Sequence, residues 1–73
     1  MNMSVMETFS ENLKYLIENS NMSANEFSKK VGIPQQTISR YLLCQREITL
    51  ENLCKIADFF GEEIDVLLGR KTF

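Results

Sequence analysis

The stretch SANEFSKKVGIPQQTISRYL, residues 23–42, predicts two short helices joined by a tight turn. Ser23 suits the N-cap of the first helix, and Glu26 lies where its side chain can reach back to the cap. Gly32 ends this helix, because glycine adopts the left-handed backbone that a sharp turn requires. Pro34 suits the first turn of the next helix, where its missing N–H costs no hydrogen bond.

Two helices that meet at such a turn need a small residue at the crossing and an apolar residue between them. Ser28 in the first helix and Ile38 in the second occupy these positions. The apolar spacing then predicts the residues that hold the pair against a core. These are Phe27, Val31, Ile33, Tyr41 and Leu42.

The segments on either side show the same helical spacing of apolar residues. A helix is expected over residues 6–19, although Ser4 and Thr8 each begin a possible capping box, which leaves its start open. A further helix is expected from the cap Thr49 to the stop Gly61, and a last one over 63–68. The inward residues of these helices are Phe9, Leu13, Leu16, Ile17, Leu50, Leu53, Ile56, Ala57, Phe60, Ile64, Leu67 and Leu68.

The pattern predicts a compact all-α fold of five helices. With 73 residues the chain forms one domain, 1–73, whose folded core covers about 6–69. We expect frayed termini at 1–5 and 70–73.

Composition excludes several classes of protein. No apolar run is long enough to span a membrane and the start is no secretory signal, so a cytoplasmic location is expected. The chain has no histidine, and Cys44 and Cys54 form no CxxC pair, so we expect no metal site and free thiols that pack as small apolar residues. The carboxylates follow solvent-facing helical patterns. We therefore predict no enzyme activity, no cofactor and no small-molecule ligand.

The stretch 23–42 resembles the helix-turn-helix of the phage-repressor (Cro/Xre-like) family. The resemblance extends over residues 13–68, because ITLENLCKIADFFGEEIDVLLG is similar to the family's fourth and fifth helices. It implies a lambda-repressor-like domain in which the second and third helices bind double-stranded DNA. A glutamine that often begins the family's second helix is replaced by Ala24, and an ion pair of the family by Ile17 and Leu42, which we therefore expect to touch.

The outward face of the third helix carries Gln36 and Arg40, and Gln35 projects from its N-terminal end. Gln35, Gln36 and Arg40 are expected to read bases, because glutamine can bond adenine and arginine guanine in the major groove. A surface ion pair remains the alternative for Arg40. Leu43 points outward where a basic residue would help. The residues expected to contact the DNA backbone or to support base contacts are Ser23, Asn25, Thr37, Ser39 and Arg46.

Charge is unevenly distributed along the chain. The net charge is −2, yet residues 27–48 carry +3, which leaves −5 for the rest. This polarisation suits a protein with one face toward DNA. The small number of cations predicts modest nonspecific affinity and a shallow dependence on salt.

A single recognition helix reads only a few base pairs, so a homodimer on a palindromic site is expected. The candidates for the dimer contact, each with an ordinary core or surface role as the alternative, are Phe59, Val66, Leu68 and Phe73. The predicted function is a sequence-specific transcription regulator, with repression as the expected role. The alternative is a protein-interaction module, such as an antitoxin or adaptor on the same fold.

Overall fold

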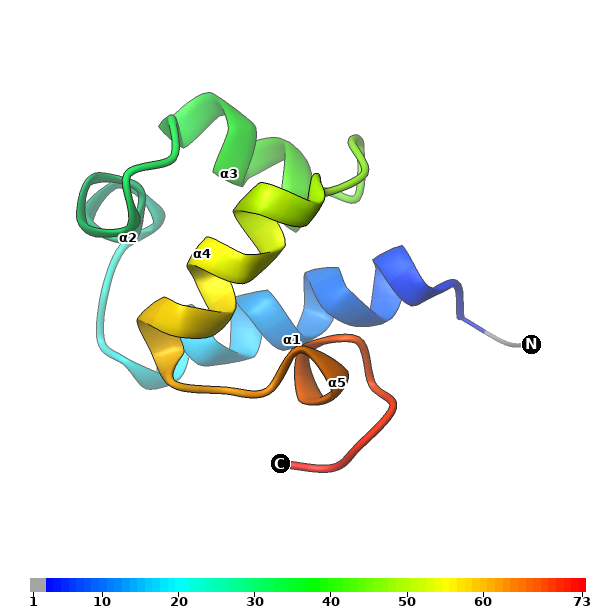
Figure 1. Ribbon diagram of the computed structural model, residues 1–73. Coiled ribbons are helices and arrows are strands. Elements are labelled where there is room, and N and C mark those ends of the chain that lie inside the picture. The colour runs from blue at the N-terminus through cyan, green and yellow to red at the C-terminus, as the bar shows by residue number, and fades with distance from the viewer. Residues whose placement is uncertain (1–2) are drawn as a thin grey trace.

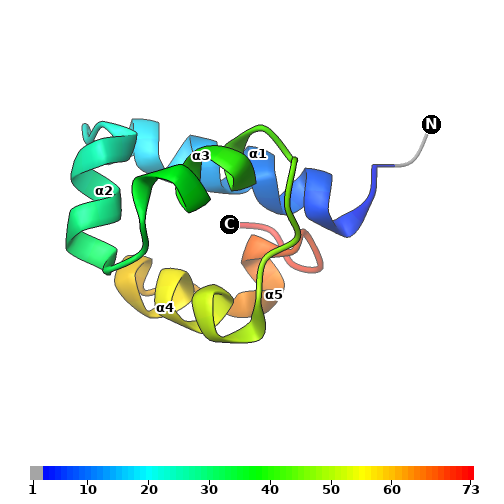
Figure 2. The same ribbon diagram turned by 90° about the horizontal axis from the view of Figure 1, so that it is seen from above.

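The computed structural model describes residues 3–73, which fold into five α-helices joined by short loops (Figure 1). They are α1 (Val5–Asn19), α2 (Ala24–Val31), α3 (Gln35–Leu42), α4 (Leu50–Phe60) and α5 (Ile64–Leu67). These residues contain no strand, which confirms the all-α prediction. Seen from above, α3 lies alongside α1 and partly over it, α4 runs on the opposite side, and α2 lies at one end (Figure 2).

Polar side chains cap the starts of three helices. The Ser4 hydroxyl accepts from the Glu7 N–H at 3.0 Å, and the Glu7 carboxylate accepts from the Ser4 N–H at 2.9 Å. This capping box starts α1 at Val5, one residue before the predicted Met6, and Thr8 is not the cap. Ser23 and Thr49 cap α2 and α4 as predicted, although Glu26 does not reach back to complete a box at Ser23. Pro34 is the N-cap of α3 rather than a residue of its first turn.

Each helix is followed by a residue in the left-handed region. The five residues are Asn21, Gly32, Cys44, Gly61 and Gly69. At Gly61 the backbone confirms the predicted stop, because the Glu62 N–H donates to Ala57 O and the Gly61 N–H to Asp58 O. At Gly32 the φ of 77° confirms the predicted turn between α2 and α3.

The core confirms most of the predicted inward residues. Its buried apolar side chains are Phe9, Leu13, Leu16, Ile17, Phe27, Ile33, Ile38, Tyr41, Leu53, Ile56, Ala57 and Leu67. Two predictions are wrong. Leu50 is 82% exposed, because no neighbouring element covers its side of the first turn of α4, and Ile64 is 37% exposed. The single turn of α5 presents only one side to the core, and Val66 and Leu67 occupy it.

The two cysteines differ in part from expectation. Cys44 and Cys54 are free thiols, but both are exposed, so the prediction that they pack as small apolar residues is wrong. Cys44 follows α3 in the loop, and Cys54 lies on α4 on a side that no other helix covers. None of the helices in residues 3–73 has both the length and the apolar character needed to cross a membrane.

The C-terminal residues 70–73, predicted to be frayed, make several contacts. The Arg70 N–H donates to Asp65 O at 2.8 Å, and Lys71 Nζ donates to Glu63 Oε2 at 2.8 Å. The Phe73 ring lies 5.4 Å from the ring of Tyr15 on α1. Of the predicted frayed start, residues 1 and 2 lie outside the described part, whereas Ser4 and Val5 belong to the start of α1.

Candidate nucleic-acid interface

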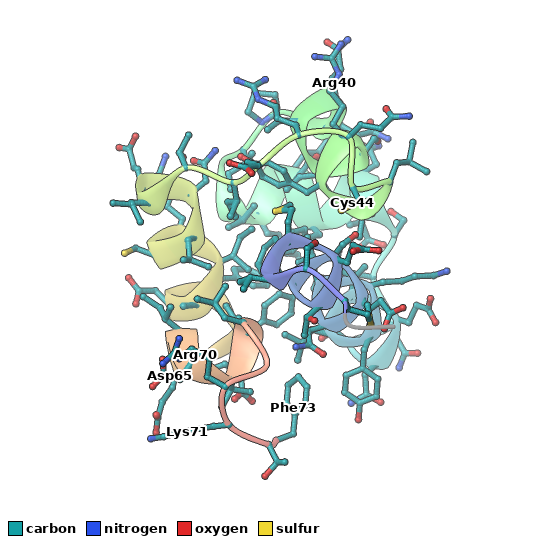
Figure 3. All side chains as sticks on the ribbon, turned by 90° about the vertical axis from the view of Figure 1, so that its right-hand side faces the viewer. Arg40, Cys44, Asp65, Arg70, Lys71 and Phe73 are labelled. Carbon is teal, nitrogen blue, oxygen red and sulfur yellow. The ribbon has the colours of Figure 1, made fainter. Side chains whose placement is uncertain are left out.

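Helix α3 lies on the surface with one face buried and the other exposed. Ile38 and Tyr41 are fully buried on its inner face, Gln36 and Arg40 are exposed on the outer face, and Gln35 is exposed at its N-terminal end. Arg40 projects away from the core, at the opposite end of the molecule from the C-terminal tail (Figure 3). Gln36 and Arg40, four residues apart, therefore share one accessible helix face, and Gln35 is accessible at the start of the helix.

Contacts from α1 and α4 hold the C-terminal half of α3. The Ser10 hydroxyl lies 2.6 Å from Tyr41 O and 2.9 Å from Leu42 O, and donates to these carbonyls. The Asn52 amide donates to the Tyr41 hydroxyl at 2.9 Å. The Phe9 and Tyr41 rings meet edge to face at 6.4 Å. The place of Ser10 on the apolar face was readable from its spacing to Leu13, but its partners were not, since they lie 31 and 32 residues away.

The turn between α2 and α3 forms a shallow groove. Ser28 is buried at the crossing, as predicted, and its hydroxyl donates to Asn25 O at 2.7 Å. Asn25, Lys29, Pro34 and Gln35 are among the residues that line the groove. Asn25 thus lies close to the start of α3. Lys29, which the sequence did not single out, lines the same groove as Gln35.

The other predicted backbone contacts are spread around α3. Thr37 and Ser39 are partly buried on its flanks. The Ser23 hydroxyl accepts from the Glu26 N–H at 3.0 Å, so its cap role occupies it in part. Arg46 is exposed in the loop after α3 and lines a depression with Ser4. The candidates therefore flank α3 at both ends.

Ile17 and Leu42, predicted to touch, lie on the same side of the domain. They line the same apolar groove between α1, α2 and the end of α3, and Leu42 packs against the core cluster that contains Ile17. Ala24 lines this groove too. Leu43, at the end of α3, is 66% exposed, as the sequence predicts.

The profile of the helix-turn-helix family matches residues 13–67. The chain belongs to the helix-turn-helix family of the Cro/C1 type. This membership confirms the resemblance and makes the chain a DNA-binding regulator with a lambda-repressor-like fold. No curated protein and no solved structure matches the chain.

The cations around the helix-turn-helix are not engaged in ion pairs. Within residues 3–73 the ion pairs join Arg70 to Asp65 and Lys71 to Glu63, both near the C-terminus. Arg40 takes part in neither, so its predicted alternative role in a surface ion pair has no support among these residues. Lys29, Lys30 and Arg46 are likewise outside these pairs.

The predicted dimer residues of the helix-turn-helix protein differ in accessibility. Val66 is buried and Leu68 packs against the core, so neither offers much surface to a second copy. Phe59 and Phe73 are exposed. The Phe59 ring also makes edge-to-face contacts, with ring centroids 5.3 Å from Phe27 and 5.1 Å from Phe60. The described residues hold no group of three or more His, Cys, Asp or Glu side chains that could bind a metal ion.

Proposed function

We propose that this helix-turn-helix regulator is a repressor that binds a palindromic operator as a homodimer, with α3 in the major groove. The observation that supports this function is the division of α3 into two faces. Ile38 and Tyr41 fix the inner face in the core, while Gln35, Gln36 and Arg40 have no partner within residues 3–73. Side chains left free on a rigid surface helix are available to read base edges.

Each exposed side chain has a matching base contact. Gln35 and Gln36, in the first turn of α3, would accept from N6 and donate to N7 of adenine, and Arg40 would donate to guanine O6 and N7. Thr37 and Ser39 would support these contacts from the flanks. Ser23, Asn25 and Arg46 would contact phosphates, and Lys29, which lines the same groove as Gln35, adds a cation to this set.

In a homodimer both α3 helices face the same duplex, at positions about 34 Å apart along it. The dimer contact must therefore lie beside α3 and not at the opposite end of the protomer. Phe73 lies at the end of the molecule opposite Arg40, where a contact would turn the two α3 helices away from each other (Figure 3). Leu50 on α4 is the most exposed large apolar residue among 3–73, and α4 flanks α3 when seen from above (Figure 2). We therefore place Leu50 in the dimer contact, with Phe59 of the same helix as a second candidate.

Selection of bound sequences from random duplex DNA tests base reading. The wild-type protein should recover a palindrome with two equal half-sites. Gln35→Ala and Gln36→Ala should relax the preference at different positions, because each loses a bidentate contact. Gln45→Ala is the matched control, since this exposed glutamine lies beyond the end of α3 and should leave the base preference intact. Recovery of no sequence at low salt would reject DNA reading and favour a protein-interaction module.

Sedimentation of the Leu50→Glu variant tests the dimer contact. Glutamate suits the first turn of a helix, so the fold should persist while a charged side chain enters the contact. We expect the variant to be monomeric and to lose affinity for a full palindrome while keeping it for one half-site. If Phe73→Ala dissociates the dimer and Leu50→Glu does not, the contact belongs at the tail instead.

A regulator of this kind would act in the cytoplasm, where its DNA lies.

A further inference from the structure

Two side chains on α1 make equivalent contacts with two different helices. Ser10 donates to the carbonyls of Tyr41 and Leu42, the last two residues of α3. Two positions further along α1, the Asn12 amide donates to the carbonyls of Val66 and Leu67, the last two residues of α5, at 3.2 and 3.0 Å. Helix α1 therefore caps the C-terminal ends of both α3 and α5.

The end of α3 depends on Ser10 for one of its carbonyls. The Cys44 N–H donates to Tyr41 O at 3.1 Å, and the Gln45 N–H donates to Arg40 O at 2.8 Å. Leu42 O receives no backbone N–H within residues 3–73, and its hydrogen bond comes from Ser10. Ser10 itself is buried, and Leu42 is half-buried beside a shallow depression that both residues line.

We propose that Ser10 is a positioning residue for DNA reading, which sets the direction of α3 relative to the rest of the domain. This inference rests on the proposed function of α3. The apolar contact of Leu42 with the core that contains Ile17 holds α3 close, but such contacts are non-directional. The Ser10 hydroxyl shares its single proton between the two carbonyl oxygens. This contact has preferred angles at the oxygens and, together with the bond from Asn52 to the Tyr41 hydroxyl, restricts rotation and tilt of the helix end.

A small tilt at the end of α3 becomes a larger displacement at its start, where Gln35 and Gln36 lie. Tyr41 lies six residues from Gln35, which corresponds to about 9 Å along an α-helix. A tilt of about 10° at the end of α3 would therefore move its start by roughly 1.6 Å. Such a shift exceeds the tolerance of about 0.5 Å within which a binding site has to be held. Ser10 would thus affect base discrimination without touching DNA.

The test compares Ser10→Ala with Asn12→Ala. Both variants remove an α1 side chain that donates to the last two carbonyls of a helix, but only Ser10 contacts α3. The affinity of each folded protein is measured at low temperature for the duplex selected by the wild type and for a scrambled duplex of the same length and composition. Circular dichroism at the same temperature confirms that each variant is folded.

We expect Ser10→Ala to lower the ratio of the two affinities by about fivefold or more, since misplacing one bidentate base contact has an effect of this size. Asn12→Ala should keep the ratio within about twofold of the wild type. An unchanged ratio in folded Ser10→Ala, or an equal loss in Asn12→Ala, would overturn the inference. If Ser10→Ala is unfolded, Ser10→Cys gives the same readout, because a thiol keeps the site filled but is a weak donor.

Selection of duplexes by the wild-type protein distinguishes a failure of this inference from a failure of the proposed function. If the wild-type protein selects no duplex, the proposed function fails and the positioning role of Ser10 fails with it. If the wild type selects a sequence and folded Ser10→Ala discriminates equally well, only the positioning role is overturned.

Discussion

At the residue scale, Cys44 has a backbone conformation that is unusual for a cysteine. Its φ is 56°, in the left-handed region that favours glycine. Three of the other left-handed residues in 3–73 are glycines, and the fourth is Asn21, whose type tolerates this region. Cys44 makes the same end-of-helix hydrogen bonds after α3 that Gly61 makes after α4. Its side chain therefore costs free energy without contributing burial, since it is exposed.

We predict that Cys44→Gly stabilises the protein by about 0.5–1 kcal/mol. Removing Cβ relieves about 1–2 kcal/mol of left-handed strain, and the added freedom of the unfolded chain offsets part of this gain. Urea denaturation would measure the change.

Cys54→Gly is the matched control for this prediction, because Cys54 is also exposed but lies inside α4. We expect it to destabilise by about 1 kcal/mol, as glycine does in a helix interior. Loss of stability in both variants would contradict the strain at Cys44.

Gly69 carries a second constraint besides its φ of 78°. A Cβ there would collide with Thr8 Cγ2 on α1, whereas a Cβ at Gly61 would meet no atom within 4 Å. We predict that Gly69→Ala destabilises more than Gly61→Ala, which costs about 1–2 kcal/mol from its backbone alone. Thermal unfolding of the two variants would compare them. Thr8→Ser in the Gly69→Ala background should recover part of the difference, and no recovery would mean that Thr8 is not the obstacle.

At the element scale, the capping box makes the stability of the start of α1 depend on pH. The backbone N–H and then the hydroxyl of Ser4 lower the pKa of the Glu7 carboxyl below its ordinary value. A carboxyl whose pKa is lower in the folded state stabilises the fold when ionised. This contribution is present above the pKa of the unfolded chain and is lost as the pH falls through the folded-state pKa.

We predict that Glu7→Gln lowers the thermal midpoint near about pH 7 and that the gap to the wild type narrows toward about pH 3. Glutamine keeps an oxygen for the Ser4 N–H, so the variant removes the charge and preserves the cap. Glu11→Gln is the matched control, because this exposed carboxylate on the same helix makes no hydrogen bond to the cap. A gap of equal size at both pH values would show that the charge of Glu7 is not the cause.

At the scale of the whole molecule, cations at the two ends differ in whether they are paired. Arg40 lies at one end, and Asp65 lies at the other with Arg70 and Lys71 (Figure 3). The tail cations Arg70 and Lys71 are paired with carboxylates, and the cations near α3 remain available to phosphates. The small number of these cations limits how many counterions DNA binding can release.

We predict a slope of log affinity against log salt no steeper than about −4 per protomer, since four cations lie within residues 27–48. Titration of a fluorescent duplex at several salt concentrations would measure it. Lys29→Gln should reduce the slope by about one, and Lys55→Gln, on α4 outside this stretch, should leave it unchanged. A steeper slope would mean that cations elsewhere in the chain reach the duplex.

The sequence was sufficient for the local features of the fold. Caps at Ser23 and Thr49, the turn at Gly32 and the stop at Gly61 depend on residues a few positions apart, so their chemistry is visible in the chain itself. The helical spacing likewise identified most of the core. It failed at Leu50 and Ile64, because periodicity assigns an inward direction without showing whether another helix covers that turn.

The sequence by itself determined the five helices, the family and the set of exposed side chains on α3, since each follows from local spacing or from a motif. Only the tertiary structure decided how α3 is held. The bonds of Ser10 to the end of α3 and of Asn12 to the end of α5 join residues 31 to 55 positions apart. Every residue has the same backbone carbonyl whatever its side chain, so no sequence pattern identifies which carbonyl a buried hydroxyl or amide will reach.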